Sequence, residues 1–270
     1  MKVKKAIIPA AGFGTRNLPI TKVVPKEMFP IQGKPAIHYV VEEAIQSGIE
    51  EILIIISRSK TSIIDYFDRS IELENFLKER NKSHLIHKIM PPSVHIQYLR
   101  QPVANGLGDA LLLAEPFIND EPFVVLLPDD IFIDKECDLI QLIETFKQVH
   151  SSVVGVKYVE DDLLKNYGVI KENKVKDNLY EILDIVEKPQ NHPPSNLAVV
   201  GRYVFNPDIF SYLKKVKPDK SGEVQLTAGL KGIIVDKKCF AKEVVGERYD
   251  IGTEVGYVKL IERMNINDGK

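Results

Sequence analysis

Short apolar runs of strand length alternate with amphipathic segments of helical length through the first half of this 270-residue chain. The runs at residues 6–9, 52–56 and 123–127 are apolar at every position, so strands formed from them would bury both faces. The segment after Pro35 instead spaces its apolar residues along one helix face and stops at Gly48. Strands buried on both faces and separated by helices are typical of a parallel sheet that helices cover on both sides.

The other segments of residues 1–150 fit the same alternation. We expect one further strand, at residues 94–99. Helices are expected at residues 61–67, 107–114 and 139–149, together with a polar helical excursion that ends before Pro91.

From Ser152 onward the pattern changes to β-like segments joined by polar turns. Strands are expected at residues 153–156, 168–171, 182–186 and 199–205. Helices are expected after Pro207, near residues 224–232, and from Glu254 to about Met264. Because no repeat or low-complexity linker divides the chain, we predict one α/β domain of residues 1–270. Its central sheet is mixed and mostly parallel, with a smaller β-rich lobe after residue 150.

The overall charge points away from nucleic acid and membrane partners. Lys and Arg number 36 against 38 Asp and Glu, so a phosphate site has to be built locally. The apolar runs are too short to span a bilayer, and the first of them stops at Pro9, too early for a signal peptide. Cys137 and Cys239 belong to no metal or redox motif, so we expect reduced thiols in a cytoplasmic protein.

A glycine-rich loop, PAAGFGTRNLP at residues 9–19, directly follows the first strand. Its glycines allow close approach to a phosphate, and backbone N–H groups in such a loop can line an anion site. A dinucleotide-binding loop needs a third glycine where this chain has Asn17, and no P-loop motif is present. The loop instead continues into cations at Arg16, Lys22 and Lys26. A phosphate site and a solvated surface turn both remain open on this pattern alone.

Two carboxylates, Asp129 and Asp130, follow the apolar run at residues 123–127. Ligands of open α/β sheets bind at the carboxyl ends of the strands, and carboxylate oxygens there suit Mg²⁺. The alternative is a turn or a helix N-cap, since Asp favours both.

Two further loops carry polar residues after expected strands. Gln101 precedes a glycine pair that begins at Gly106, and its amide can read a base edge. Glu187 and Lys188 end another strand and can bind sugar hydroxyls and a phosphate. A plain glycine-rich loop and a solvated strand end are the respective alternatives.

Taken together, these segments resemble the bacterial UTP–glucose-1-phosphate uridylyltransferases (UDP-glucose pyrophosphorylases), within the sugar nucleotidyltransferase group. The resemblance covers nearly the whole chain. It rests most strongly on AAGFGTRNLPITKVVPKEM at residues 10–28. It continues through RQ at 100–101, GLG at 106–108, LPDD at 127–130, YGVI at 167–170, VEKP at 186–189, PSNLAVVGRYVF at 194–205, GEVQLT at 222–227 and YDIGT at 249–253.

The resemblance implies a Rossmann-like nucleotidyltransferase fold and a set of site residues. Nucleotide-binding positions would be Ala11, Gly12, Gly14, Thr15, Glu27, Gln101 and Gly106. Arg16 and Lys26 would neutralise the triphosphate, and Asp129 with Asp250 would hold Mg²⁺. Gly168 and Glu187 would contact the sugar and Lys188 its phosphate. Arg16, Lys26, Asp129 and Lys188 are thus the expected catalytic residues.

The implied reaction joins UTP and glucose 1-phosphate into UDP-glucose and releases pyrophosphate, in a homodimer or homotetramer. Thymidylyl transfer from dTTP uses the same architecture and is the nearest alternative. A weakly active paralogue that binds UDP-sugars and regulates is another. It is kept open by Asn105 and Asp109, where the family commonly has Lys and His, and by Ala228, where many members have Asp.

Overall fold

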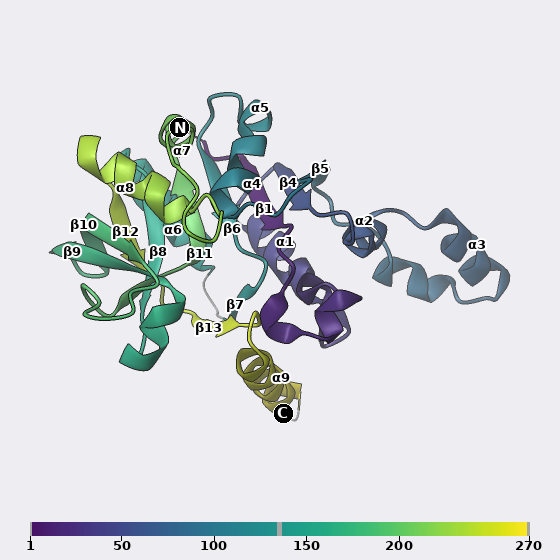
Figure 1. Ribbon diagram of the computed structural model, residues 1–270. Coiled ribbons are helices and arrows are strands. Elements are labelled where there is room, and N and C mark those ends of the chain that lie inside the picture. Colours follow the sequence, from purple (N-terminus) through teal and green to yellow (C-terminus); the bar gives the residue numbers. More distant parts are fainter. Residues whose placement is uncertain (1, 134–136, 269–270) are drawn as a thin grey trace.

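The structure is a computed structural model that describes residues 2–133 and 137–268. At its centre is a nine-stranded mixed sheet with the strand order β5-β4-β1-β6-β11-β8-β12-β10-β9, flanked by helices (Figure 1). In chain order the strands are β1 (Lys5–Ala10), β4 (Glu51–Ile56), β5 (His95–Arg100), β6 (Phe123–Leu126), β8 (Val153–Tyr158), β9 (Gly168–Lys176), β10 (Leu179–Glu187), β11 (Leu197–Phe205) and β12 (Phe240–Glu243).

Strands β5, β4, β1 and β6 pair in parallel, as the apolar runs predict. Neighbouring residues of β1 enter different cores, with Ile8 on one face of the sheet and Ile7 on the other. The Ile8 face is covered by α1 (Ala36–Gln46) and α6 (Asp138–Val149). The Ile7 face is covered by α4 (Leu107–Leu113), α5 (Glu115–Ile118), α7 (Ile209–Leu213) and α8 (Leu226–Asp236). The expected α/β architecture is therefore confirmed.

The strands after residue 150 pair mainly antiparallel. Strand β11 joins the two parts of the sheet, since it runs antiparallel to both β6 and β8. Strand β10 is antiparallel to β9 and β12, whereas β8 and β12 are parallel. The sheet is mixed, as expected, and its parallel pairings are concentrated in the first half of the chain.

Several short strands were not expected from the sequence. Besides β12, the chain forms β7 (Asp130–Ile133) and β13 (Glu247–Asp250), an antiparallel pair outside the main sheet whose register sets Asp250 opposite Asp130. Strands β2 (Pro30–Ile31) and β3 (Lys34–Pro35) form a small hairpin. Segments of two to four residues are too short to show a hydrophobic period, so no sequence pattern predicts them.

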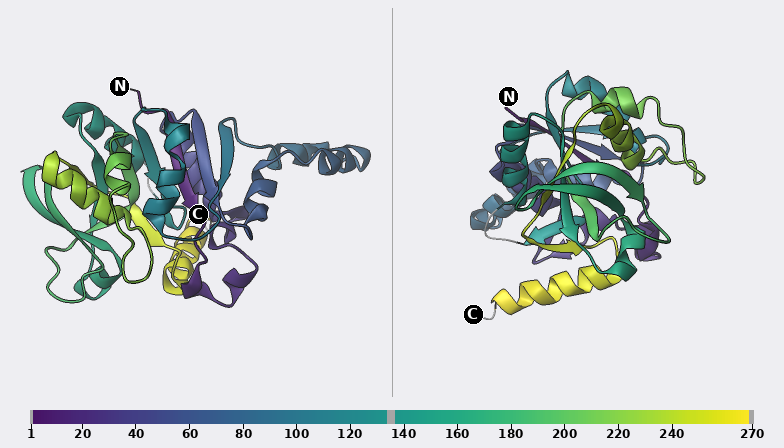
Figure 2. Two further views of the ribbon diagram at one scale, coloured as in Figure 1. Left: turned by 45° about the horizontal axis from the view of Figure 1, so that its top comes forward. Right: turned by 90° about the vertical axis from the view of Figure 1, so that its left-hand side faces the viewer.

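Two peripheral elements stand out from the body. The helix expected at residues 61–67 is α2 (Thr61–Phe67). The polar excursion expected after it contains α3 (Ile71–Glu79) and a 3-10 helix (Ser83–Lys88), and it projects away from the sheet (Figure 1). Helix α9 (Glu254–Asp268) lies below the sheet in Figure 1 and in the right-hand view of Figure 2, and it runs about one turn longer than expected. Within residues 2–133 and 137–268, no helix combines the length and apolarity needed to cross a membrane.

Candidate functional site

The loop after β1 is tightly folded, and it places Arg16 and Lys26 at the edge of the sheet. Gly14 adopts a left-handed conformation with φ 65°, which glycine tolerates without strain, and its carbonyl accepts a hydrogen bond from Thr21 Oγ1 at 2.8 Å. Asn17 is buried and donates from Nδ2 to the Ile251 carbonyl at 3.2 Å. In place of the long helix of a dinucleotide site, the loop forms three single 3-10 turns, Thr15–Asn17, Ile20–Lys22 and Lys26–Met28.

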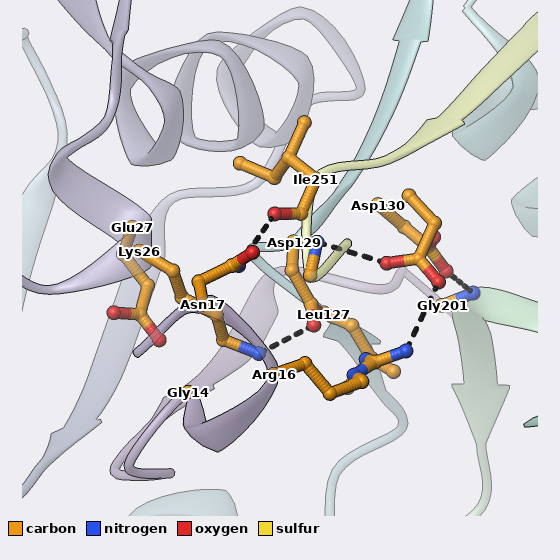
Figure 3. A network of polar contacts seen from close by, with 12 residues as sticks. Gly14, Arg16, Asn17, Lys26, Glu27, Leu127, Asp129, Asp130, Gly201 and Ile251 are labelled. Atoms are coloured by element: carbon orange, nitrogen blue, oxygen red, sulfur yellow. Dashed lines mark hydrogen bonds and ion pairs between the residues drawn. The ribbon is translucent and has the colours of Figure 1, made fainter. Parts of the chain in front are cut away.

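The last of these turns brings Lys26 to the end of β6. Its Nζ donates a hydrogen bond to Asp129 Oδ2, and both side chains are largely buried (Figure 3). Burial acts against the charged form of each group, but their mutual attraction outweighs it. The pKa of Asp129 is consequently lowered and that of Lys26 is raised. Both groups are therefore charged at neutral pH, with Arg16 further favouring the Asp129 carboxylate.

Asp250 reaches the same place from the end of β13. Its Oδ2 accepts a hydrogen bond from the Tyr167 hydroxyl at 3.0 Å and lies 3.6 Å from Arg16 Nη1. The following turn keeps the space between the carboxylates open. A Cβ at Gly252 would lie 3.0 Å from Asp129 Oδ2, 2.8 Å from Asp250 Oδ1 and 2.6 Å from Arg16 Nη2. Asp129 and Asp250 thus face one small volume that only a glycine leaves free.

This geometry fits a divalent cation completed by its substrate. Among residues 2–133 and 137–268, no group of three or more His, Cys, Asp or Glu side chains could hold a metal ion. Two carboxylates beside an open volume are nevertheless what Mg²⁺ commonly uses, because it keeps waters and takes further oxygens from substrate phosphates.

Replacing Gly252 by Ala should fill this volume. The backbone of Gly252 is outside the left-handed region, so alanine is conformationally allowed, and the atoms it meets are ends of side chains. We expect kcat to fall on the order of tenfold to a hundredfold, since the two carboxylates and Arg16 must shift by a fraction of an ångström or more. The melting temperature should change little. A variant with wild-type kcat would show that this volume plays no part in turnover.

The expected nucleotide residues line one cavity of about 350 Å³. Its wall includes the loop after β1, the loop after β5 and the end of β6. The expected residues that line it are Ala11, Gly12, Gly14, Thr15, Lys26, Glu27, Gln101, Gly106 and Asp129. Of the other two cations of the loop, Arg16 lines a second cavity described below, and Lys22 lines neither cavity. Gly106 has φ 98°, and a Cβ there would lie 2.8 Å from the Val224 carbonyl, so this turn also requires glycine.

Glu27 differs from the others because its carboxylate is already occupied. Both of its oxygens accept hydrogen bonds from Lys60 Nζ at 2.8 Å, and both side chains are nearly inaccessible. Burial lowers the pKa of Lys60, while the Glu27 carboxylate opposes that shift. Lys60 was not expected from the sequence. Because Glu27 belongs to the 3-10 turn Lys26–Met28, its pairing with Lys60 anchors this turn and so helps to position Lys26.

The expected sugar and metal residues line a second cavity, of about 270 Å³. Glu187 ends β10 opposite Gly168, the first residue of β9. Lys188 follows with φ 45°, and its Nζ lies 3.2 Å from Glu187 Oε1. The expected residues in this wall are Arg16, Asp129, Gly168, Glu187, Lys188 and Asp250. Asp129 lines both cavities, so the two adjoin at this carboxylate.

Two arginines that the sequence did not single out hold the turn bearing Asp129. Arg202, fully buried in β11, donates to the carbonyls of Leu127 at 3.2 Å and Asp130 at 2.8 Å, and its charge is balanced by Glu43 at 2.7 Å. Arg248 donates to Asp130 Oδ1 from Nε at 2.8 Å and stacks over the Tyr167 ring. Asp130 also accepts the Gly201 N–H at 2.8 Å (Figure 3). Asp130 is therefore a structural carboxylate.

One of these arginines had a usable sequence signal. Arg202 interrupts the run LAVVGRYVF, which is otherwise apolar, and a lone charge in a strand buried on both faces requires a buried partner. Arg248 and Lys60 lie in mixed polar segments with no comparable contrast.

Comparison with known proteins agrees with this geometry. The family model described as nucleotidyl transferase matches residues 5–265. A Bacillus subtilis (strain 168) protein, provisionally named a UTP–glucose-1-phosphate uridylyltransferase, is 52% identical over 263 residues, 97% of each chain. A second protein of that strain, named UTP–glucose-1-phosphate uridylyltransferase, is 45% identical over 95% of this chain and 89% of its own. A crystal structure of UDP-glucose pyrophosphorylase complexed with UDP-glucose superposes with a TM-score of 0.88 at 41% identity, covering 98% of this chain and 100% of that one.

Proposed function

The chain belongs to the nucleotidyl transferase family, and from this premise we propose that it transfers a uridylyl group from UTP to glucose 1-phosphate. The products are UDP-glucose and pyrophosphate. The observation that carries the proposal is the pair of adjoining cavities that share Asp129, one beside the glycine-rich loop and one beside Glu187 and Lys188. A nucleotide and a sugar phosphate bound in them would meet at that carboxylate.

The chemistry requires no covalent enzyme intermediate. A phosphate oxygen of glucose 1-phosphate attacks the α-phosphorus of UTP, and the bond to the bridging oxygen breaks. Pyrophosphate leaves with the bonding electron pair. Catalysis then consists of alignment and charge neutralisation. In our proposal Lys188 orients the attacking phosphate, and Arg16 with Lys26 neutralises the triphosphate and the departing pyrophosphate.

We propose that Asp129 and Asp250 hold the divalent cation and that this ion is Mg²⁺. When bound, the ion supplies charge neutralisation for the reacting phosphates. Lys26 keeps Asp129 ionised and fixed in place. Tyr167 holds Oδ2 of Asp250, and Oδ1 accepts the Gly252 N–H at 2.9 Å, so both oxygens are fixed beside the gap at Gly252.

We assign the two substrates to the two halves of the chain. We propose a single domain of residues 1–270 in which residues 1–150 bind the nucleotide and residues 151–270 bind the sugar phosphate. We also propose that the protein works in the cytoplasm as a homodimer or homotetramer. Exposed Ile71, Leu73 and Phe76 on the projecting α3 support self-association, because large apolar side chains on a protruding helix favour burial.

Pyrophosphate release tests the activity directly. Purified protein is incubated with glucose 1-phosphate, Mg²⁺ and either UTP or dTTP. We expect release with UTP. Release with dTTP in preference to UTP would establish thymidylyl transfer instead, and UDP-glucose binding without release would establish a regulatory paralogue.

Lys188 and Glu187 should affect different substrate features. We expect Lys188→Ala to lower kcat/KM for glucose 1-phosphate by about tenfold to a hundredfold with UTP binding largely retained, because a positioned cation near the phosphate is lost. Glu187→Gln should change the preference among glucose, galactose and mannose 1-phosphates more than Lys188→Ala does, because in our proposal the Glu187 carboxylate accepts hydrogen bonds from the sugar hydroxyls.

A matched control for these two variants is Lys174→Ala. Lys174 lies on the neighbouring strand β9, where its side chain is exposed and pairs with Asp177. It should leave every kcat/KM unchanged. If Lys188→Ala and Glu187→Gln behave like this control for all three sugar phosphates, the sugar site lies elsewhere.

A further inference from the structure

The side-chain amide of Gln101 is held in one orientation by a carboxylate. Gln101 follows β5 and is only 4% exposed. Its Nε2 donates to Asp109 Oδ2 at 2.7 Å and makes a longer bond to the Gly106 carbonyl at 3.4 Å. Asp109 lies in the first turn of α4, so its own position is set by the helix. Both bonds use the amide nitrogen.

The identity of Asp109 determines which amide atom faces it. An ionised carboxylate only accepts hydrogen bonds, so the atom 2.7 Å from Asp109 must be the NH₂ group and not the carbonyl oxygen. A flipped amide would set two acceptors against each other. The carbonyl Oε1 of Gln101 is thereby directed away from Asp109, in a residue that lines the nucleotide cavity. Gln101 therefore keeps its acceptor, Oε1, for a partner other than Asp109.

We infer that Asp109 determines base specificity by locking Gln101 as an acceptor, an inference that rests on the proposed uridylyl transfer. A fixed acceptor pairs with a base that carries a ring N–H. Uracil and thymine present N3–H as a donor, whereas cytosine presents N3 as an acceptor. A Gln101 held in this orientation favours UTP and other 2,4-dioxopyrimidine nucleotides over CTP. With CTP, the acceptor N3 of cytosine would face the acceptor Oε1 of Gln101, and neither would have a donor. Asp109 acts through Gln101 and is a positioning residue.

Asp109→Asn isolates this effect. Asparagine has nearly the same shape but offers either a carbonyl or an NH₂ group, so Gln101 is free to turn and present its own NH₂ to the base. We expect the ratio of kcat/KM for UTP to that for CTP to fall about tenfold or more in this variant. The ratio of equilibrium dissociation constants for the two nucleotides, measured without glucose 1-phosphate, should move in the same direction.

The matched control is Glu115→Gln. It removes the same charge from the neighbouring helix α5, but Glu115 pairs with Lys214 at the surface and does not contact Gln101. We expect both ratios to stay at their wild-type values in the control. Loss of charge alone would instead move both variants equally, and that outcome overturns the inference.

The measurements separate failure of the inference from failure of the proposed function. If the wild type releases pyrophosphate from UTP and Asp109→Asn keeps the wild-type ratios, the proposed function stands and the role of Asp109 is refuted. If the wild type neither binds nor turns over UTP, the proposed function fails, and so does the proposal that this cavity binds a nucleotide. A lower ratio in Asp109→Asn alone supports the inference.

Discussion

Replacing Asp129 by Asn is expected to lower kcat by on the order of a hundredfold or more, the scale for removing one preorganised charge-stabilising group. Asp129 is the carboxylate on which both cavities meet, and it faces the gap that Asp250 shares. The substitution removes one of the two proposed cation ligands and leaves buried Lys26 without its ion-pair partner. Both changes act on the reacting phosphates. The measurement is pyrophosphate release at saturating UTP over a range of Mg²⁺ concentrations.

Asp120→Asn provides the control for this prediction. It makes the same chemical change at an exposed residue in the turn before β6 and should leave kcat and the Mg²⁺ dependence unaltered. Wild-type kcat and Mg²⁺ dependence in Asp129→Asn would assign the cation to other residues.

Removing the buried Arg202 should have the largest effect on stability. Arg202→Met leaves Glu43 without its partner and removes donors from the carbonyls of Leu127 and Asp130. We expect the free energy of unfolding to fall by about 3–5 kcal/mol, the usual consequence of breaking one side of a buried pair. Activity should also fall, because the turn that carries Asp129 loses the hydrogen bonds that Arg202 donates to its carbonyls. Urea unfolding and the initial rate measure the two effects.

A double variant distinguishes the uncompensated charge from the lost packing. With Arg202→Met and Glu43→Met together, no unpaired charge remains, and much of the stability should return. Activity should stay low, because the two carbonyls still lack their donors. Full activity in the double variant would show that the hydrogen bonds from Arg202 to the two carbonyls are not needed for turnover. An Arg202→Met variant as stable as the wild type would show that the Arg202–Glu43 pair does not stabilise the fold.

The sequence predicted the parts of the fold that follow from local hydrophobic pattern. The runs that became β1, β4 and β6 are apolar throughout because helices cover both of their faces. The spacing after Pro35 predicted α1 because one of its faces packs on that sheet. The same logic located the ends of β6 and β10, where Asp129 and Glu187 lie.

Features that depend on pairing between distant segments were not predictable in this way. Four-residue strands such as β7 and β13 exist because each provides the other's hydrogen bonds, and neither carries a pattern of its own. The partners of buried charges are equally hidden, since nothing local links Lys60 to Glu27 or Arg202 to Glu43. The contact between Gln101 and Asp109 spans one loop and one helix turn, yet depends on the orientation of a single amide.

The β7–β13 pair has a consequence for the order in which the protein becomes active during synthesis. Every strand of the main sheet precedes Asp250 in the chain, and Asp250 is brought to Asp129 only when β13 joins β7. Domains begin to fold from the N-terminus as the ribosome extends them. A nascent chain that has completed its sheet therefore has the walls of the nucleotide cavity but a single carboxylate facing the gap beside Arg16. The second carboxylate of the proposed cation site is thus the last to be put in place, when the segment from Glu247 onward has left the ribosome and paired with β7.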